Sequence, residues 1–426
     1  MKRRLTAAAA ALLGIVLLTS CGNPKEFSDG ERLSAGYERN SDTSVTCQYV
    51  NAATEAPKSY HNYAIGAAAF SLSQLRARAA ENTGSFVFSP AAVTLQLGLA
   101  ANAASSDMRQ ELLLALGSTM TLDDVNACSS YFKSRMETVS KTGQAKAPAE
   151  QIKLGGAMLV NQDTDVKTAF LQSNADFYGY DVFRYDFSDE NAADKLNHYL
   201  KPYTGNSAVD VTAGGSLYAV TTSEVIDRWL VPYAENTATA GSFNGANGAR
   251  NTVFLRSDET VVQSKKATGM LKYTEKNPLR LLLILPESKL GLEDYLASFD
   301  PSELSALLDS VDVTKRSPAL IPEMTVESDG KGVPLSASLA KSGLYSMFSD
   351  KAGFSLGYSK TTKAGEMFEI PPAFSLTAAG INCKAETASA PVTAEAPKDA
   401  LIFDRPFLFM LLDNETDIPV LAGVYR

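Results

Sequence analysis

The spacing of apolar residues places helices in the first half of the chain and strands in the second. Apolar positions that recur three and four residues apart predict helices with one buried face; these segments are 64–78, a helix opening at Ser89-Pro90, 109–116, 122–139, 169–177 and 192–200. Short alternating or continuous apolar runs predict strands; these are 85–88, 152–160, 217–222, 252–255, 279–285, 319–326 and 401–412. Helices followed by strands predict an α+β domain built on a large sheet.

Helix ends carry residues with the matching backbone chemistry. Ser89 is a good N-cap, and Pro90 fits the first helical position because its missing N–H is not needed there. Thr121 has the same capping role for the helix that starts at residue 122, and Gly117 is a normal helix stop.

A long run of small residues interrupts the C-terminal strands. Residues 374–411 begin as an apolar strand and end in a dense hydrophobic block, while 378–400 between them are rich in Ala, Thr, Ser and Pro. Loops of this length inside a compact domain are uncommon and are usually functional or disordered. Since strand-forming sequence holds both ends, we interpret this stretch as a loop displayed for a function.

The N-terminus has the pattern of an export signal. A short basic region precedes an apolar run over 5–18, which is too short and too close to the terminus to be a good spanning helix. Residues 18–21, Leu-Thr-Ser-Cys, resemble the lipobox of bacterial lipoproteins. The resemblance implies removal of residues 1–20, a lipid on Cys21, a polar tether over 21–58, and an outward-facing location on the bacterial cell envelope. A plain secretory signal with a chance cysteine is the alternative.

The charge balance limits the possible partners. Cleavage before Cys21 would remove Lys2, Arg3 and Arg4 and so change the formal net charge from −9 to −12. An acidic protein is poorly suited to nucleic acid, whose affinity comes mainly from phosphate neutralisation. An anionic bilayer surface would not attract it either, so the lipid would be the only membrane anchor.

Few residues are available for metal or nucleophilic chemistry. The cysteines beyond the lipobox are Cys47, Cys128 and Cys383, and their spacing argues against a disulfide framework and a zinc site. A single Cys47–Cys128 bridge remains open. His61 and His198 are the only histidines and have no serine-containing elbow beside them, so we expect no catalytic triad, no enzyme activity, no metal and no cofactor.

Several short segments occur in the order seen in one known family. They are 86–90, 107–112 with 116–117, 186–188, 196–199, 204–206, Trp229 with 232–233, 282–286, 321–326, 401–411 with Asp-Arg-Pro-Phe at 404–407, and 421–424. Together they resemble the serpin family over about residues 60–426. In that resemblance, Trp229 corresponds to the family's tryptophan near the top of the main sheet.

The resemblance implies a serpin domain over 59–426, with a large central mixed β-sheet, further sheets, about nine helices and an exposed reactive-centre loop at about 380–400. It also implies a monomeric inhibitor of serine proteases. In inhibitory serpins the target protease cuts the loop, whose N-terminal part inserts as a new strand into the central sheet and carries the acylated protease with it. A dozen new strand pairs would release on the order of 10 kcal/mol.

Insertion requires alternate side chains of the loop to enter the core. If Gly380 is the family's hinge glycine and helps the backbone to change phase, the inward residues are small or apolar: Ile381, Cys383, Ala385, Thr387 and Ser389. Lys384 and Glu386 then face outward. A one-residue slip would bury both charges, which is costly unless they pair, so the first register is preferred.

Counting from Gly380 at the family's usual spacing places the scissile bond at Ala394–Glu395, with Glu395–Ala396 as the neighbouring choice. The residues before the bond are small, which suits proteases with shallow specificity pockets, such as elastase-like or subtilisin-like enzymes. No arginine lies in the exposed loop, which argues against a trypsin-like target.

The chain departs from the inhibitory pattern at the hinge and in the sheet. Ala378-Ala379 replaces the family's acidic pair, and the residues after Gly380 are Ile-Asn-Cys-Lys rather than a threonine and mostly alanines. The family's buried sheet histidine corresponds to Ile370 or Pro371, so sheet opening must be controlled differently or not at all. The alternative function is a non-inhibitory serpin-fold protein that binds a partner or is only a protease substrate.

Overall fold

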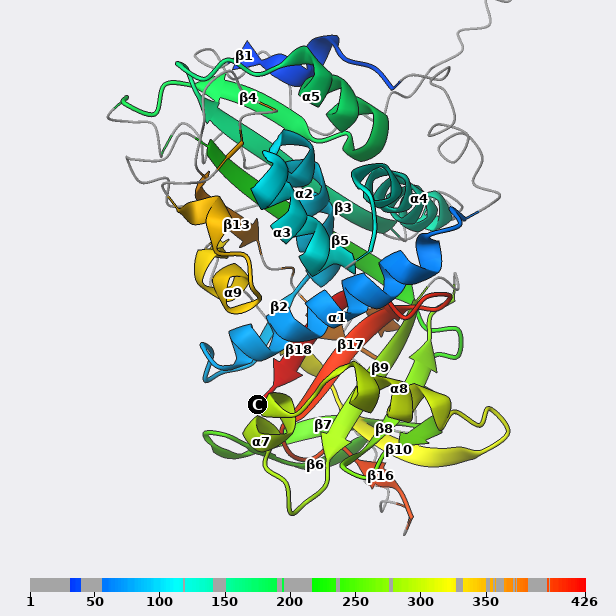
Figure 1. Ribbon diagram of the computed structural model, residues 1–426. Coiled ribbons are helices and arrows are strands. Elements are labelled where there is room, and N and C mark those ends of the chain that lie inside the picture. The colour runs from blue at the N-terminus through cyan, green and yellow to red at the C-terminus, as the bar shows by residue number, and fades with distance from the viewer. Residues whose placement is uncertain are drawn as a thin grey trace, which may run out of the picture.

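Two large sheets and the helices that cover them make up the fold (Figure 1). The structure is a computed structural model, and it describes residues 31–39, 56–117, 119–140, 151–189, 194, 217–234, 238–275, 279–326, 332–349, 353–354, 357, 364–370, 372, 374–381, 397 and 399–426. Each sheet has nine strands within these ranges. The predicted α+β architecture with a large mixed sheet is confirmed.

The first sheet runs in the order β1-β4-β3-β5-β15-β14-β11, and β13 pairs with both β5 and β12. Its strands are β1 (Glu31–Arg32), β3 (Gln151–Asn161), β4 (Asp181–Tyr185), β5 (Leu217–Arg228), β11 (Met324–Val326), β12 (Val333–Pro334), β13 (Ala364–Ile370), β14 (Phe374–Leu376) and β15 (Gly380–Ile381). The sheet is mixed, because β5 is parallel to β13 but antiparallel to β3 and β15.

The second sheet runs in the order β16-β10-β7-β8-β9-β17-β18-β2, with β6 paired to β7. Its strands are β2 (Phe86–Phe88), β6 (Thr239–Gly245), β7 (Gly248–Gln263), β8 (Ala267–Tyr273), β9 (Leu279–Pro286), β10 (Arg316–Pro322), β16 (Leu401–Ile402), β17 (Phe407–Asp413) and β18 (Pro419–Tyr425). Every residue of β17 and β18 is buried. Burial on both faces explains why these strands are nearly continuous apolar runs in the sequence.

The helices lie over both sheets. In the described ranges the α-helices are α1 (Tyr60–Ala79), α2 (Pro90–Ala103), α3 (Ser106–Gly117), α4 (Leu122–Ser140), α5 (Thr168–Ser173), α7 (Leu292–Ala297), α8 (Pro301–Asp309) and α9 (Ser336–Lys341), with a π-helical turn at η3 (Asn174–Tyr178) and 3-10 turns at η1 (Leu33–Gly36) and η4 (Ser346–Phe348). In Figure 1, α2 lies across β3 and β5, and α1 crosses β18. None of the described helices has both the length and the apolar content that a membrane span needs.

The predicted helix caps are confirmed. The Ser89 hydroxyl accepts a hydrogen bond from the Ala92 N–H at 3.2 Å, and the Thr121 hydroxyl accepts one from the Asp124 N–H at 3.1 Å. These bonds satisfy N–H groups that the first turn of a helix leaves without a partner.

Two predicted strands are each divided in the structure. The predicted strand 319–326 separates into β10, which pairs with β7, and β11, which pairs with β14 in the other sheet. The predicted strand 401–412 separates into β16 and β17, which pair with β10 and β9. The apolar pattern continues through both divisions because the chain stays buried, while its strand partners change.

A segment near the N-terminus is packed against the edge of the first sheet. Within the predicted tether, β1 pairs with β4, and the Arg32 guanidinium donates from Nε to Asp181 at 2.8 Å. Arg184 forms an ion pair with Glu31 at 2.9 Å, and the Ser34 hydroxyl accepts from the Val182 N–H at 3.3 Å. This part of the predicted tether therefore belongs to the folded body.

Cys128 is a buried free thiol in α4. Its sulfur lies 3.7 Å from the Ser59 hydroxyl oxygen. Burial raises the pKa of the Cys128 thiol to about 12, because the thiolate would lose its hydration. Cys47, the partner of the alternative disulfide, lies outside the described residues.

We expect Cys128 to resist thiol reagents in the folded protein. At pH 8 a pKa near 12 leaves a thiolate fraction on the order of 1,000-fold below that of an unfolded cysteine, since only the thiolate reacts. Alkylation with and without urea, followed by peptide mass spectrometry, measures the difference. Rapid native labelling of Cys128, or a Cys47–Cys128 peptide seen without reductant, would contradict a buried free thiol.

Candidate functional site

The site residues predicted from the sequence fall into two groups. Trp229, Gly380 and Ile381 lie in the described part of the chain. The loop residues Cys383, Ala385, Ala394, Glu395 and Ala396 and the predicted lipid attachment residue Cys21 lie outside it. The described residues form the beginning of the loop, next to the first sheet.

The predicted hinge is a tight turn between β14 and β15. The Thr377 N–H donates to the Gly380 carbonyl at 3.0 Å, and the Gly380 N–H donates to the Thr377 hydroxyl at 3.4 Å. Ala378 and Ala379 form the tip. The expectation that Gly380 helps the backbone change phase is not needed here: Gly380 is not among the described glycines with positive φ, and it lies in extended β15. The reversal takes place at the two alanines.

β15 occupies a strand position between β5 and β14. Gly380 and Ile381 pair antiparallel with Arg228 and Asp227 of β5. On its other side, Ile381 pairs with Leu376 of β14. At this end of the sheet, a strand formed by the start of the loop therefore separates β14 from β5.

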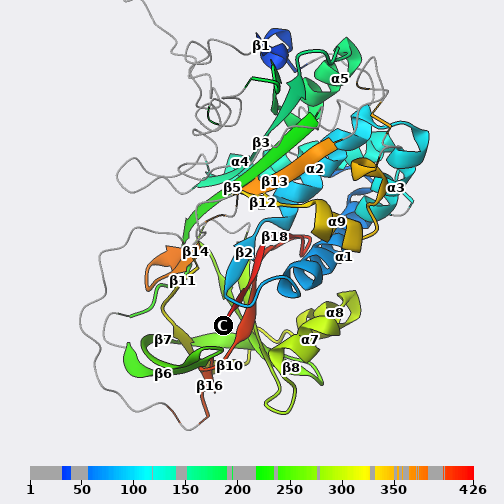
Figure 2. The same cartoon turned by 90° about the vertical axis from the view of Figure 1, so that its left-hand side faces the viewer.

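Farther along, the same edge of β5 has a different partner. β13 pairs with β5 in parallel, and the last pair is Ile370 with Thr222. No described strand pairs with residues 223–226 of β5 on this edge, between the β13 and β15 pairings. Figure 2 shows β13 beside one part of β5 and β14 near its other end. This edge is the seam of the first sheet.

The side chain of Ile381 points into the core. It is 0% exposed, as are Phe374 and, within one per cent, Leu376 of β14. Residues directly opposite in a pair share one face of a sheet, so Ile381 and Leu376 lie on the same inner face. The predicted inward register is confirmed for Ile381.

Trp229 holds the turn through its backbone and its side chain. Its N–H donates to the Ala379 carbonyl at 3.1 Å, and its indole Nε1 donates to the Thr377 carbonyl at 2.9 Å. The Tyr233 N–H donates to the Ala378 carbonyl at 3.1 Å. Thus three carbonyls of the turn accept hydrogen bonds from the segment that follows β5.

A buried cation lies behind this segment. The Lys272 ammonium of β8 is 4.1 Å from the ring centre of Tyr233 and 5.4 Å from that of Trp229, and it pairs with Glu259 at 2.5 Å. Burial lowers the pKa of Lys272, while the carboxylate of Glu259 opposes that shift. The contacts stabilise the aromatic pair that carries the turn.

The sequence analysis identified Trp229 but not its supporting residues. Lys272 interrupts the apolar segment 270–273, and a lysine in a buried strand is a signal of a buried partner. Ala378-Ala379 was noted only as the loss of an acidic pair. In the structure these alanines contribute backbone carbonyls, which no side-chain pattern reveals.

Comparison with known proteins agrees with this architecture. The family model of the serpins, described as serine protease inhibitors, matches residues 66–426. The chain belongs to the serpin family. As a serpin it falls in a family of protease inhibitors rather than catalytic enzymes.

Individual serpins are similar at low identity. Serpin A9 of Mus musculus is 23% identical over 377 residues, covering 81% of this chain and 84% of the relative. Alpha-1-antichymotrypsin of Pongo abelii is 22% identical over 354 residues, covering 78% and 79%.

Solved serpin structures share the fold. Native tengpin, a thermophilic serpin, has a TM-score of 0.76 at 19% identity, covering 93% of this chain and 99% of tengpin. Human thyroxine-binding globulin has a TM-score of 0.70 at 17% identity, covering 86% and 98%.

Replacing Trp229 with Phe should loosen the turn. W229F keeps an aromatic ring but removes the indole donor, so the Thr377 carbonyl loses a partner, at a cost of about 1–3 kcal/mol. We expect lower stability in urea by circular dichroism and faster hydrogen exchange at residues 378–381. A stability loss with unchanged exchange at these residues would show that the indole bond does not hold the turn.

Proposed function

We propose that this serpin is a suicide substrate of serine proteases, in which a cleaved loop inserts into the first sheet and traps the acylated protease. One observation carries the proposal. β15, the beginning of the loop, lies between β5 and β14 and is antiparallel to both, with Ile381 facing the core. A strand that continued from β15 would extend along the seam.

The register of β15 supports insertion of the residues that follow. Gly380 pairs with Arg228 and Ile381 with Asp227, so each further loop residue moves one residue back along β5. Continued in this way, Glu386 would face Thr222, where the β13 pairing now begins. Insertion past Ala385 would therefore require β5 and β13 to separate. Pro391 lacks an N–H and would make fewer ladder bonds than its neighbours.

The chemistry at the loop is that of an interrupted proteolysis. The serine oxygen of the protease attacks the Ala394 carbonyl, and the peptide bond to Glu395 breaks, with the proton passing to the new amine. The loop is then joined to the protease by an ester. Water can hydrolyse this ester and release the enzyme, so trapping requires insertion to be faster than hydrolysis. Glu395–Ala396 is the neighbouring candidate bond.

Small residues before the bond favour elastase-like or subtilisin-like proteases as targets. The second candidate function is that of a non-inhibitory serpin that binds a partner or is only cleaved. The unusual residues after Gly380 favour it. Thyroxine-binding globulin, crystallised as a complex with thyroxine, has the same fold, so the fold alone does not decide between the two.

A panel of elastase-, subtilisin- and trypsin-type proteases tests the proposal. We expect a covalent complex that survives denaturing electrophoresis with the first two classes, at a ratio near one to one. Mass spectrometry of the released C-terminal fragment identifies the bond. Cleaved protein should also melt at a higher temperature than intact protein. Cleavage with undiminished protease activity and no rise in melting temperature would favour the non-inhibitory alternative.

A charge at the inward hinge position should separate cleavage from trapping. In I381E a carboxylate replaces a side chain that is 0% exposed, and burying it without a partner is costly. We expect cleavage at a similar rate, with at least tenfold less covalent complex. N382E adds the same charge at the next position, which faces outward by alternation, and should retain most trapping. Equal loss in both variants would contradict the inward register.

We also propose that Cys21 carries a lipid that anchors the protein to the outer side of a bacterial cell envelope. The proposal rests on the lipobox-like residues 18–21 after a short apolar run. The inhibitor would then act on proteases outside the cell, as a monomer on a membrane anchor.

Replacing Cys21 with Ala tests the anchor. In a bacterial host the wild-type protein should label with a radioactive or alkyne-tagged fatty acid and sediment with membranes. C21A should neither label nor sediment, because a signal without the cysteine cannot be lipidated. A C21A protein that still sediments and labels would overturn this assignment.

A further inference from the structure

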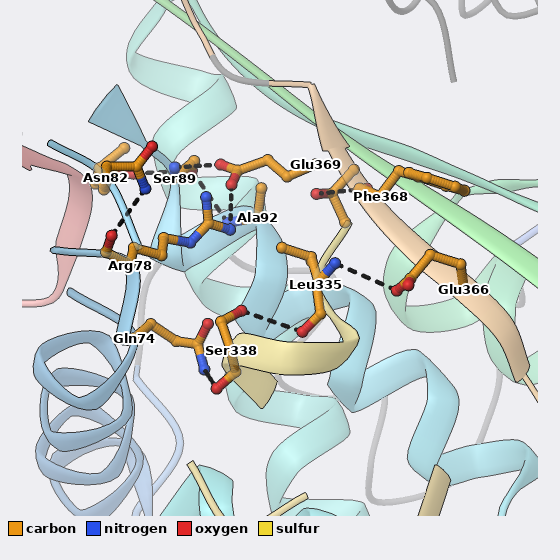
Figure 3. A network of polar contacts seen from close by, with 12 residues as sticks. Gln74, Arg78, Asn82, Ser89, Ala92, Leu335, Ser338, Glu366, Phe368 and Glu369 are labelled. Atoms are coloured by element: carbon orange, nitrogen blue, oxygen red, sulfur yellow. Dashed lines mark hydrogen bonds and ion pairs between the residues drawn. The ribbon is translucent and has the colours of Figure 1, made fainter. Parts of the chain in front are cut away.

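A buried ion pair lies beneath the seam of the first sheet. Glu369 of β13 is 0% exposed, and its Oε2 lies 2.5 Å from Nη2 of Arg78 in α1 (Figure 3). Arg78 is 4% exposed, and its guanidinium lies over the Phe88 ring at 4.4 Å from the centre. The pair is one residue from Ile370, a position where the sequence analysis noted the loss of a buried histidine.

The second carboxylate oxygen of Glu369 joins β13 to two further elements. The Ser89 N–H, at the start of α2, donates to it at 2.5 Å. The Ser89 hydroxyl in turn donates to the Val420 carbonyl of β18 at 2.8 Å. A carboxylate is favoured beside a helix N-terminus. Through one side chain, β13 is thus tied to α1, to α2 and to the second sheet.

Polar contacts through α9 strengthen the connection between β13 and α1. Glu366 of β13 accepts hydrogen bonds from the Ser336 N–H and hydroxyl, at 2.9 and 2.6 Å, at the start of α9. At the other end of α9, Gln74 of α1 donates to the Ser338 carbonyl at 3.1 Å and to the Ser342 hydroxyl at 2.8 Å. β13, α9 and α1 therefore form one bonded unit.

The contacts across the seam are weaker. Besides the backbone pairs, the Thr221 hydroxyl of β5 donates to the Phe368 carbonyl at 3.5 Å, the limit of a hydrogen bond. The rings of Tyr218 and Phe368 are stacked at 6.5 Å between centres. Glu369 itself pairs with Thr221 along the backbone. The strong polar bonds of β13 thus point toward α1 rather than toward β5.

Insertion of a strand would widen the seam by about 4.8 Å, the spacing of neighbouring strands. If β13 moved that far from α1, the Arg78–Glu369 contact would break and leave both charges buried without partners, which is strongly unfavourable. If β5 moved instead, only the weaker contacts would be lost.

We propose that Arg78 and Glu369 are a positioning pair that keeps β13 fixed to α1 while β5 moves away, so that the loop inserts against a fixed edge. The inference rests on the proposed insertion mechanism. It assigns to a buried charged pair the control of the seam that the missing histidine leaves open.

The variant E369Q tests the pair, with D413N as a matched control. Asp413 is also fully buried and pairs with Arg135, but it lies in β17 of the second sheet, away from the seam. Both variants should lose stability in urea. For E369Q the loss should be similar in loop-intact and loop-cleaved protein, because the pair persists in both forms. We also expect E369Q, unlike D413N, to consume at least threefold more inhibitor molecules per trapped protease.

A second set of variants removes the ambiguity of an unpaired buried charge. R78M/E369L removes both charges and should fold even if E369Q does not, since apolar replacement of a buried pair is tolerated. It should show the same raised inhibitor consumption, which R78K, with its charge retained, should partly restore.

The outcomes separate this inference from the proposed function. If wild-type protein traps proteases and E369Q and R78M/E369L match D413N in consumption, the pair has only a structural role and the inference is overturned. A stability loss confined to the intact form would also overturn it, because the pair would then break on opening. Wild-type protein that neither traps proteases nor gains stability on cleavage overturns the proposed function and the inference together.

Discussion

The edge of β5 is the constraint on which the rest of the structure depends. A strand edge presents N–H and carbonyl groups that need partners. Along this edge β13 supplies them in parallel up to Thr222, and β15 supplies them antiparallel at Asp227 and Arg228. The edge thus changes partner and direction within a few residues. A sheet with such a seam is prepared to exchange one partner for another.

Hydrogen bonds from one segment determine where the loop begins. Trp229 and Tyr233, directly after β5, donate to the carbonyls of the turn that starts β15. The same segment contacts the second sheet, where Leu230 donates its N–H to the Tyr273 carbonyl. The start of the loop is therefore held where the two sheets meet. Any change at the seam is transmitted to the hinge through this segment.

Local chemistry made much of the fold predictable. Ser89 and Thr121 cap helices as expected, because the capping bond involves residues only three positions apart. The inward direction of Ile381 follows from period-two alternation and from the cost of burying the charges nearby. The division of 319–326 between two sheets was not predictable, because both parts have the same apolar pattern and differ only in their partners.

By itself, the sequence determined the family, the order of the elements and the face that the start of the loop buries, since these depend on local pattern and on motif order. Only the tertiary structure decided that β15 separates β14 from β5, and that the chain reverses at Ala378-Ala379 rather than at Gly380. It also brought Arg78 and Glu369, distant in the sequence, into one buried pair. The physical reason is the same in each case: a strand's neighbour and a buried charge's partner are chosen by packing in space, which the local pattern does not encode.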